Sequence, residues 1–518
     1  MAMGGNGRDN LVCDVLIIGS GPIGAAFART LCKPGRKVIM VEAGQYGSRR
    51  AGECRKNDWA FQRDLNGYGY FVRGQMFPVS VPPASVPSTA NALNPLQDPD
   101  TNLPGAVLSY AVGGMAVHWT CAIPEQHPDL ERHGFIDADE WSGLYHRARE
   151  LLNCHTDVFS NSSRHKALRA YLEKHSYRPV DTPLAAERRP GAEFARFSGT
   201  DTVLGDLADV SPGYDPNAGF VLLPGHAVRR LVRDPANEHR IVSAEVSDVI
   251  ANRTFSISAD TFVVAAGWLH TPQILWVSGI HTHGGSALGR YLHDHTFTAT
   301  TIVLREEVLE QMRSEADDVL AAAEDQNDPA PIGISKREPP PHMYLPVSEN
   351  QLWHGMIFRE SFQFDPLPAD IDDRRVVDLK WFGMIDPVES NYVEFSADGN
   401  RDRLGMPQPT FHVRLGEEDK RRMADMKKHM TEVAGVLGSP LPGYEPREIP
   451  LGASTHTMGL TRMGAEDDHG RTSVVDPFSK VWGLDNLYVG GNCVLPTRNA
   501  CNPTLTSMAL ALRSADSI

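Results

Sequence analysis

The sequence lacks the marks of membrane proteins and of nucleic-acid-binding proteins. Its longest apolar run near the N-terminus covers only Val15 to Ile18, far too short for a secretory leader or a membrane span. Lysine and arginine number 50 against 65 aspartates and glutamates, a net charge of −15 that leaves no basic field for phosphates or anionic lipid. We therefore expect a cytoplasmic protein without a nucleic-acid or membrane partner.

The sequence also lacks the cysteine spacing of disulfide frameworks and zinc ribbons. Its seven cysteines are odd in number and scattered, and no pair is spaced as C-x-x-C, so reduced thiols are expected. Four histidines form two H-x-H pairs, His281 with His283 and His293 with His295, but no cysteine accompanies them. This spacing fits no zinc site, and we expect no metal.

What is present is the composition of a soluble globular protein with a large core. Hydrophobic residues make up 41% of the 518 residues and charged residues 22%. At a typical ~150 residues per domain, the length indicates about three domains, or two large ones that share a ligand.

A nucleotide-binding pattern opens the chain. An apolar run of strand length ends at Gly19, and Gly21 and Gly24 complete a G-x-G-x-x-G turn before a helix-like stretch of small residues. Such a turn lets a pyrophosphate approach the backbone at a helix N-terminus. A second buried strand ends at Glu42, whose carboxylate can accept the ribose hydroxyls and would repel a 2′-phosphate. The pattern therefore predicts a site for FAD or NAD rather than NADP.

Further along, periodicity predicts several elements. Residues 139–152 and 420–437 have helical spacing, the second with methionines on its apolar face. Residues 227–232, 241–246 and 261–267 form strand-like runs, and a helix is expected to start at Thr271-Pro272. The proline-rich residues 76–104 predict an extended surface segment.

Four later segments carry a family resemblance. They are residues 111–122 (AVGGMAVHWTCA), 289–295 (GRYLHDH), 454–464 (STHTMGLTRMG) and 486–506, which includes ACNPTLT. Together with the N-terminal turn, these segments resemble the glucose–methanol–choline (GMC) oxidoreductases, and among them the pyranose and glycoside oxidases.

The resemblance implies an α/β fold with two domains. A Rossmann-like FAD-binding domain with a parallel sheet would comprise residues 1–135, 215–298 and 465–518. A substrate-binding α+β domain with a largely antiparallel sheet would comprise residues 136–214 and 299–464. The implied activity is FAD-dependent oxidation of a secondary hydroxyl, at C2 or C3 of a pyranose sugar or glycoside, to a ketosugar.

The resemblance also assigns residues to the reaction. His456 matches the base that accepts the hydroxyl proton, Asn502 matches its hydrogen-bonding partner, and Thr120 matches a hydroxyl beside the flavin. A neutral imidazole suits the first role because its usual pKa is near 6.5. Further FAD contacts are expected from Gly113, Gly114, Val228, Gly267, Asn492 and Thr504.

His118 matches the histidine through which FAD is covalently attached in such enzymes. The two residues before it, Ala116 and Val117, replace the Ser-Thr of the fungal pattern, so the sequence leaves the linkage open.

The substrate is expected to contact Met356, Phe358, Glu360 and Lys380. Related fungal enzymes have polar residues where Met356 and Phe358 stand, and an arginine in place of Lys380. Apolar side chains weaken the hold on a free hexose and favour an apolar group such as an aglycone.

Other functions remain open at this point. The electrons could pass to O2, giving H2O2, or to a quinone. Alternatively, the chain could be a lyase of the same superfamily with a structural FAD, or a non-catalytic flavin- or sugar-binding protein. The assembly is expected to be a monomer or a small homo-oligomer.

Overall fold

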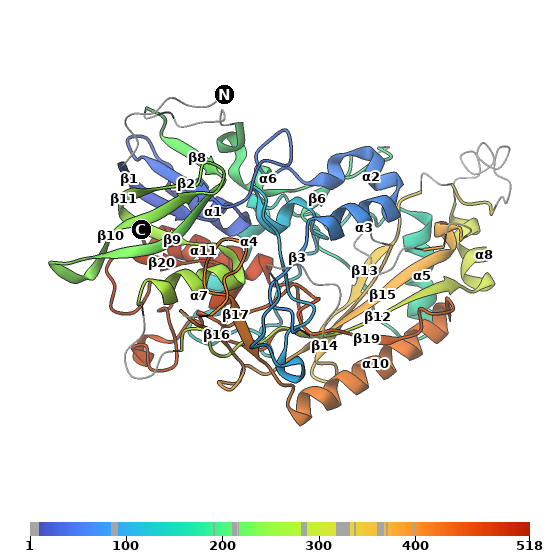
Figure 1. The fold of residues 1–518 in the computed structure, drawn as a ribbon. Coiled ribbons are helices and arrows are strands. Elements are labelled where there is room, and N and C mark those ends of the chain that lie inside the picture. The colour runs from blue at the N-terminus through green and yellow to red at the C-terminus, as the bar shows by residue number, and fades with distance from the viewer. Residues whose placement is uncertain are drawn as a thin grey trace.

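Two seven-stranded sheets organise the protein, as the computed structural model shows (Figure 1). The structure describes residues 10–83, 92–189, 192–209, 215, 217–280, 287–316, 332–335, 338–359, 367–368, 371–397 and 399–518. One sheet is mainly parallel and the other antiparallel, which confirms the predicted α/β class.

The first sheet has the strand order β8-β2-β1-β11-β10-β9, and β20 pairs with the end of β11. Strands β8, β2, β1, β11 and β20 run parallel, whereas β9 and β10 form an antiparallel meander with β11. The strands are β1 (Asn10–Ile18), β2 (Val38–Glu42), β8 (Phe220–Pro224), β9 (His226–Asp234), β10 (Asn237–Asp248), β11 (Arg253–Val264) and β20 (Leu487–Val489). The predicted strand runs at 227–232 and 241–246 lie within β9 and β10.

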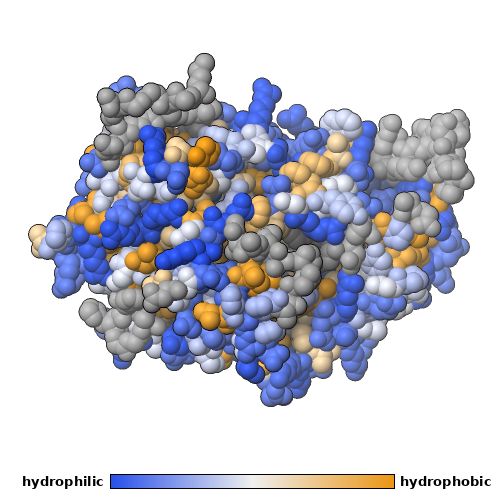
Figure 2. Space-filling model, viewed as in Figure 1, coloured by the Kyte–Doolittle hydropathy of each residue, from blue (hydrophilic) through white to orange (hydrophobic). Residues whose placement is uncertain are grey.

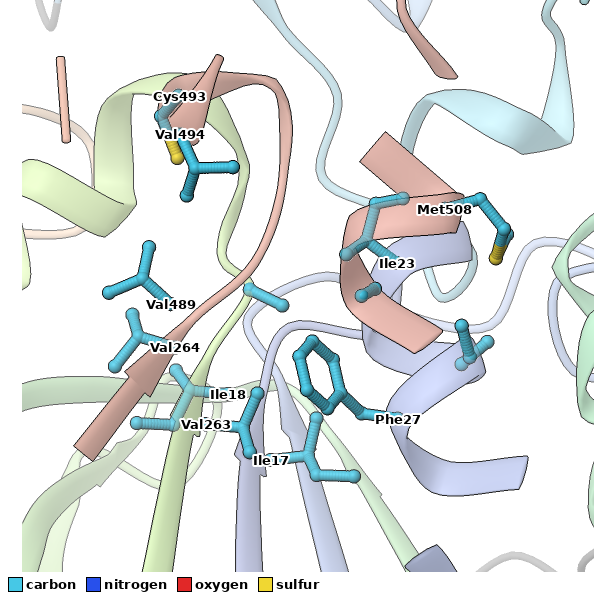
Figure 3. Close-up of a cluster of buried hydrophobic side chains, with 14 of the residues drawn as sticks. Ile17, Ile18, Ile23, Phe27, Val263, Val264, Val489, Cys493, Val494 and Met508 are labelled. Atoms are coloured by element: carbon cyan, nitrogen blue, oxygen red, sulfur yellow. The ribbon is translucent and has the colours of Figure 1, made fainter. Parts of the chain in front are cut away.

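Apolar side chains of these parallel strands form the core with two helices. In Figure 3, Ile17 and Val263 lie on the side of the strands that faces Phe27 of α1 (Pro22–Leu31), with Met508 of α11 (Thr504–Asp516) beyond, while Ile18 and Val264 lie on the opposite side. All of these side chains are almost fully buried. Strands covered by helices need continuous apolar runs, and β1 and β2 have them.

Helix α4 (Ala138–Leu151) packs against α11. The Tyr145 hydroxyl lies 2.9 Å from Thr506 Oγ1, and Arg513 donates to Glu140 at 2.6 Å. Asp137 caps the helix by accepting from the Glu140 amide. Residues 139–152 were expected in the substrate-binding domain, yet this helix shares the core of the parallel sheet.

The second sheet has the order β18-β12-β15-β14-β13-β5, with β19 also on β12. One face is covered by α10 (Glu417–Leu437), whose Met426, Met430 and Leu437 are fully buried, as the amphipathic pattern predicts. The strands are β5 (Val180–Asp181), β12 (His295–Leu304), β13 (His342–Leu345), β14 (Trp353–Phe358), β15 (Val376–Met384), β18 (Gly438–Pro440) and β19 (Arg447–Ile449). Helices α5 (Ser163–Lys174) and α8 (Glu306–Glu315) extend this cover.

One predicted helix boundary is wrong. Helix α7 (Gly267–Val277) starts at Gly267 directly after β11, so Pro272 lies inside the helix and not at its start. Gly267 has a φ of +84°, which glycine adopts without strain and which turns the chain from strand to helix within two residues.

The remaining elements are short. They are α2 (Trp59–Arg63), α3 (Leu65–Gly74), α6 (Thr200–Leu204), β3 (Phe77–Pro78), β4 (Val107–Leu108), β6 (Ala186–Glu187), β7 (Arg196–Phe197), β16 (Tyr392–Phe395) and β17 (Pro409–His412). No helix among the described residues combines the length and the hydropathy needed to cross a membrane. On the face shown in Figure 2, hydrophobic residues are interspersed with hydrophilic ones.

Candidate active site

A single cavity runs from the carboxyl ends of β1 and β2 to one face of the antiparallel sheet. Its wall combines Gly19, Gly21 and Glu42 from the first sheet with Phe297, Met356 and Phe382 from the second. Ligands of open α/β sheets bind at the carboxyl ends of the strands, and the cavity lies at that edge.

The glycines of the first turn have distinct roles. A Cβ on Gly24 would lie 2.1 Å from the Gly19 carbonyl oxygen, so this position needs glycine for α1 to pack on β1. A Cβ on Gly21 would meet no atom within 4 Å, and Gly21 lines the cavity. The backbone at the N-terminus of α1 is therefore open to a ligand, as phosphate binding requires.

Glu42 lies at the same end of the cavity. Its carboxylate accepts from the Ser20 amide at 3.0 Å, from the Ser20 hydroxyl at 2.8 Å and from the Gly44 amide at 2.7 Å. The Ser20 hydroxyl in turn accepts from the Gly113 amide at 3.0 Å. These bonds orient the carboxylate and tie the Gly113–Gly114 turn to the glycine-rich turn.

The other residues assigned to the cofactor divide into two groups. Gly114, Thr120, Val228, Gly267, Asn492 and Thr504 line the cavity, as expected, together with the glycines at 19 and 21 and with Glu42. Gly24, Gly113 and His118 are not among the lining residues. Gly24 and Gly113 instead allow backbone segments to pack closely next to the cavity, where a Cβ atom would collide with Gly19 or Gly52.

His118 lies beside the cavity and is completely buried. Its Nε2 atom is 3.3 Å from the Met115 sulfur, and Nδ1 is buried without a hydrogen-bond partner in the described part of the protein. Burial and the nearby charges of Lys56 and Arg55 lower the pKa of His118 to about 4, so the ring is neutral at pH 7.

One face of the antiparallel sheet forms the opposite wall of the cavity. Alternation along β14 and β15 points Met356, Phe358, Lys380 and Phe382 into the cavity, while Trp381 faces α10 and donates to His429 Nδ1 at 3.0 Å. Met356 and Phe358 thus both stand on strand β14. Glu360, also predicted to contact substrate, falls outside the described residues.

This wall is largely aromatic and carries one cation. The Phe297 and Phe382 rings stack with centroids 4.6 Å apart, and Lys380 Nζ lies 5.1 Å from the centre of the Phe358 ring. Met356 and Phe358 are 2% and 1% exposed, so they are buried everywhere except toward the cavity.

His456 and Asn502 meet at the cavity from segments far apart in sequence. Asn502 Nδ2 lies 3.2 Å from His456 Nε2, and both residues line the cavity. His456 Nδ1 and Asn502 Oδ1 are buried without hydrogen-bond partners among the described residues. Asn502 Oδ1 is thus an acceptor left for a ligand.

Burial lowers the pKa of His456 to about 3. The ring is consequently neutral at pH 7, with a lone pair that can accept a proton. The value differs from the 6.5 expected from the sequence because the surrounding protein excludes water and disfavours the charged ring.

Several lining residues carry no signal in the sequence. Tyr110 and His270 approach from separate segments, with the Tyr110 hydroxyl 3.0 Å from His270 Nε2. Phe297 and Phe382 could have been found from strand alternation had β12 and β15 been placed.

Among the described residues, no cluster of His, Cys, Asp and Glu side chains could hold a metal ion.

Comparison with known proteins identifies the family. Family models described as GMC oxidoreductase match residues 206–297 and 387–511. Pyranose 2-oxidase from Tricholoma matsutake is 36% identical, covering 98% of this chain and 93% of the relative. The chain belongs to the GMC oxidoreductase family.

Two further comparisons show a second sequence relative and a solved structure with the same fold. C-glycoside 3-oxidase from Microbacterium trichothecenolyticum is 33% identical, covering 97% of this chain and 95% of the relative. A solved formate oxidase from Aspergillus oryzae RIB40 has the same fold, with a TM-score of 0.66 at 14% identity and 98% coverage of both chains.

The protein is therefore an oxidoreductase that binds FAD, as predicted. The cavity suits this cofactor. One end has an accessible helix N-terminus for the phosphates and the Glu42 carboxylate for the ribose, and the opposite wall is apolar, as a flavin ring requires. The cavity also contains buried nitrogen and oxygen atoms of His456 and Asn502 that have no hydrogen-bond partner among the described residues.

The two turn glycines predict different effects of an added methyl group. Gly21→Ala should fold with an unchanged melting temperature, because the new Cβ meets no protein atom, yet it should weaken FAD binding at least about tenfold, roughly 1.4 kcal/mol. Gly24→Ala should lose about 1–3 kcal/mol of stability as well, since the methyl group collides with the Gly19 carbonyl. Thermal unfolding of the FAD-free proteins and FAD titration measure both effects.

Gly134→Ala is the matched control, because Gly134 is exposed and its Cβ would also meet nothing within 4 Å. It should leave melting temperature and FAD affinity unchanged. Normal FAD affinity in Gly21→Ala would show that the phosphates do not approach the backbone here.

Proposed function

We propose that this enzyme oxidises a secondary hydroxyl, at C2 or C3 of a pyranose sugar or glycoside, to a ketone. The observation that carries the proposal is the His456–Asn502 pair, whose side chains meet 3.2 Å apart at a cavity with a nucleotide cradle at its other end. The two relatives named above, one a pyranose 2-oxidase and one a C-glycoside 3-oxidase, support this substrate class and leave both carbons open.

His456 is the base in this proposal. Its ring is neutral at pH 7 and so accepts the hydroxyl proton as the carbon–oxygen double bond forms. The bound FAD supplies the hydride acceptor.

Asn502 orients the substrate. Its amide holds His456 Nε2, which sets the direction of the ring. Its free Oδ1 can accept a hydrogen bond from a neighbouring sugar hydroxyl and so select the carbon that reacts. Thr120 lines the same cavity with a hydroxyl that we assign to the flavin edge.

Replacing His456 should slow flavin reduction. His456→Ala should lower the anaerobic rate of flavin reduction by glucose about 10²–10⁴-fold while flavin content stays normal. Asn502→Ala should cost less, ~1–3 kcal/mol, because it loses only hydrogen bonds. Stopped-flow absorbance near the flavin band measures both rates.

The same experiment separates the alternatives. A lyase with a structural FAD, or a non-catalytic binding protein, would not bleach its flavin with any sugar under argon. Bleaching at an unchanged rate in His456→Ala would remove this histidine from the reaction.

We further propose that His118 attaches FAD covalently. Its neutral ring and the unpartnered Nδ1 next to the cavity support this role, and attachment requires the ring to turn from Met115 toward the cavity. Acid-precipitated protein should then keep its yellow colour, and His118→Ala should release the flavin on the same treatment. Colourless wild-type precipitate with all FAD in the supernatant would rule the linkage out.

The apolar wall predicts the preferred substrate. Burying an aryl group against Met356 and Phe358 could contribute about 1–3 kcal/mol, so aryl glucosides should exceed free glucose roughly ten- to hundredfold in kcat/KM. Phe358→His should shift the preference toward the free hexose, because it adds a hydrogen-bonding group at the same position. Steady-state kinetics with phenyl glucoside and glucose measure the ratio.

Phe395→Leu provides a control, since Phe395 is buried but absent from the cavity wall. It should leave the substrate ratio unchanged. Preference of the wild type for glucose, or an unchanged ratio in Phe358→His, would contradict the substrate assignment and leave the flavin chemistry intact.

The remaining assignments are also proposals. Free thiols at all seven cysteines support a reducing, cytoplasmic location. O2 or a quinone accepts the electrons, the assembly is a monomer or small homo-oligomer, and Lys380 and Glu360 contribute to substrate binding. The two-domain division stays a proposal, with the first sheet in the FAD-binding part and with α4 moved to that part, because it shares the core of this sheet.

A further inference from the structure

The turn that presents His456 is held by a buried carboxylate. Asp294, 1% exposed, accepts from the Ser454 hydroxyl, from the Thr457 hydroxyl at 3.1 Å and from the His295 amide at 2.7 Å. The Ser454 hydroxyl also accepts from the His456 amide at 3.2 Å. The carboxylate thus binds a residue on each side of His456. Through the Ser454 hydroxyl it is also linked to the backbone amide of His456.

This turn needs such support because of its backbone conformation. Thr455, directly before His456, has a φ of +61°, a left-handed conformation that a β-branched residue adopts only when its surroundings impose it. The hydrogen bonds from Ser454 and Thr457 to one carboxylate flank this residue and impose the conformation.

A second buried carboxylate holds the segment before Asn502. Glu131, also 1% exposed, accepts from the Ala500 amide at 2.7 Å, from the Cys501 amide at 3.1 Å and from the His127 amide at 2.5 Å. The two amides nearest Asn502 in the chain thus bind the same oxygen, Oε1.

Neither carboxylate is explained by an ion pair. Within the described part of the chain, no lysine or arginine lies in salt-bridge contact with Asp294 or Glu131, and burial raises the pKa of both. Burying a carboxylate is unfavourable unless hydrogen bonds compensate, and for each carboxylate two of these hydrogen bonds come from the segment of one member of the His456–Asn502 pair.

We propose that Asp294 and Glu131 are positioning residues, one for each member of the His456–Asn502 pair. Asp294 fixes the direction of the His456 ring, and Glu131 fixes the Asn502 amide opposite it. This inference rests on the proposed function, since it assumes that the pair carries out the reaction.

The titration of Asp294 adds a pH dependence. Burial raises its pKa to about 6, so protonation below pH 6 removes an acceptor of the Ser454 and Thr457 hydroxyls. The titratable groups around it are histidines: His293 and His295 in its own segment and His456 from the facing turn. Burial keeps the pKa of all three well below 6, so Asp294 is the group that changes charge there.

The test uses the FAD-loaded variants Asp294→Asn and Glu131→Gln. Anaerobic flavin reduction by phenyl glucoside should slow about 10–100-fold at saturation, with the half-saturating concentration changed less than about threefold, because only the alignment of the pair is lost. The wild-type rate should fall below pH 6. In Asp294→Asn that acid limb should disappear, leaving a low and constant rate.

Ser454→Ala tests the same contact without touching the carboxylate, and serves if Asp294→Asn does not fold. It should slow reduction in part, and the double variant Asp294→Asn/Ser454→Ala should be no slower than Asp294→Asn alone. In a crystal structure of Asp294→Asn, the His456 ring should be displaced from Asn502.

Asp476→Asn is the matched control. Asp476 also accepts two backbone amides, those of Phe478 and Lys480, and its pKa is also raised by burial, but these hydrogen bonds hold neither the His456 turn nor the segment before Asn502. This variant should lose stability without losing its reduction rate or its acid limb.

The outcomes separate the inference from the proposed function. Wild-type rates and pH profiles in Asp294→Asn and Glu131→Gln, alongside a strong loss in His456→Ala, would overturn the positioning role alone. Full activity in His456→Ala would overturn the proposed function instead.

Discussion

The 3.2 Å contact between His456 and Asn502 is the constraint on which much of the molecule depends. The two residues are 46 positions apart in sequence, lie on irregular backbone and must meet within a fraction of an ångström. A hydrogen bond between two side chains cannot hold its own segments in place. The surrounding structure does so: strand β20 places the C-terminal segment on the parallel sheet, and residues 293–295 at the start of β12 support the turn before it.

Desolvation links this geometry to the chemistry. Burial excludes water from three ionisable side chains. This is the main reason why the pKa values of His456 and His118 are lowered and that of Asp294 is raised. At pH 7 the His456 ring is therefore neutral, whereas Asp294 is still mainly ionised because its raised pKa of about 6 lies below that pH.

Successive side chains of a β-strand point to opposite faces, so the antiparallel sheet packs against α10 with one face and lines the cavity with the other. One face of β15 packs Leu379 and Trp381 against α10, while the other presents Lys380 and Phe382 to the cavity. A change on the substrate-facing side therefore leaves the helix-facing core intact.

Local sequence determined the elements whose residues interact with near neighbours in the chain. The β1–turn–α1 unit, the buried strand ending at Glu42 and the amphipathic helix α10 follow from apolar periodicity and glycine spacing. His456, Asn502 and Thr120 were found through ordered segments that resemble a family, and the structure brings all three to one cavity.

Only the tertiary structure decided which way side chains face and which remote groups support them. His118 lies outside the cavity wall, Met356 and Phe358 stand on a strand, and Asp294 and Glu131 hold segments up to 370 positions away in the chain. These features arise from contacts between distant segments and from burial. Neither is encoded in the spacing of neighbouring residues, which is why periodicity and motifs do not reveal them.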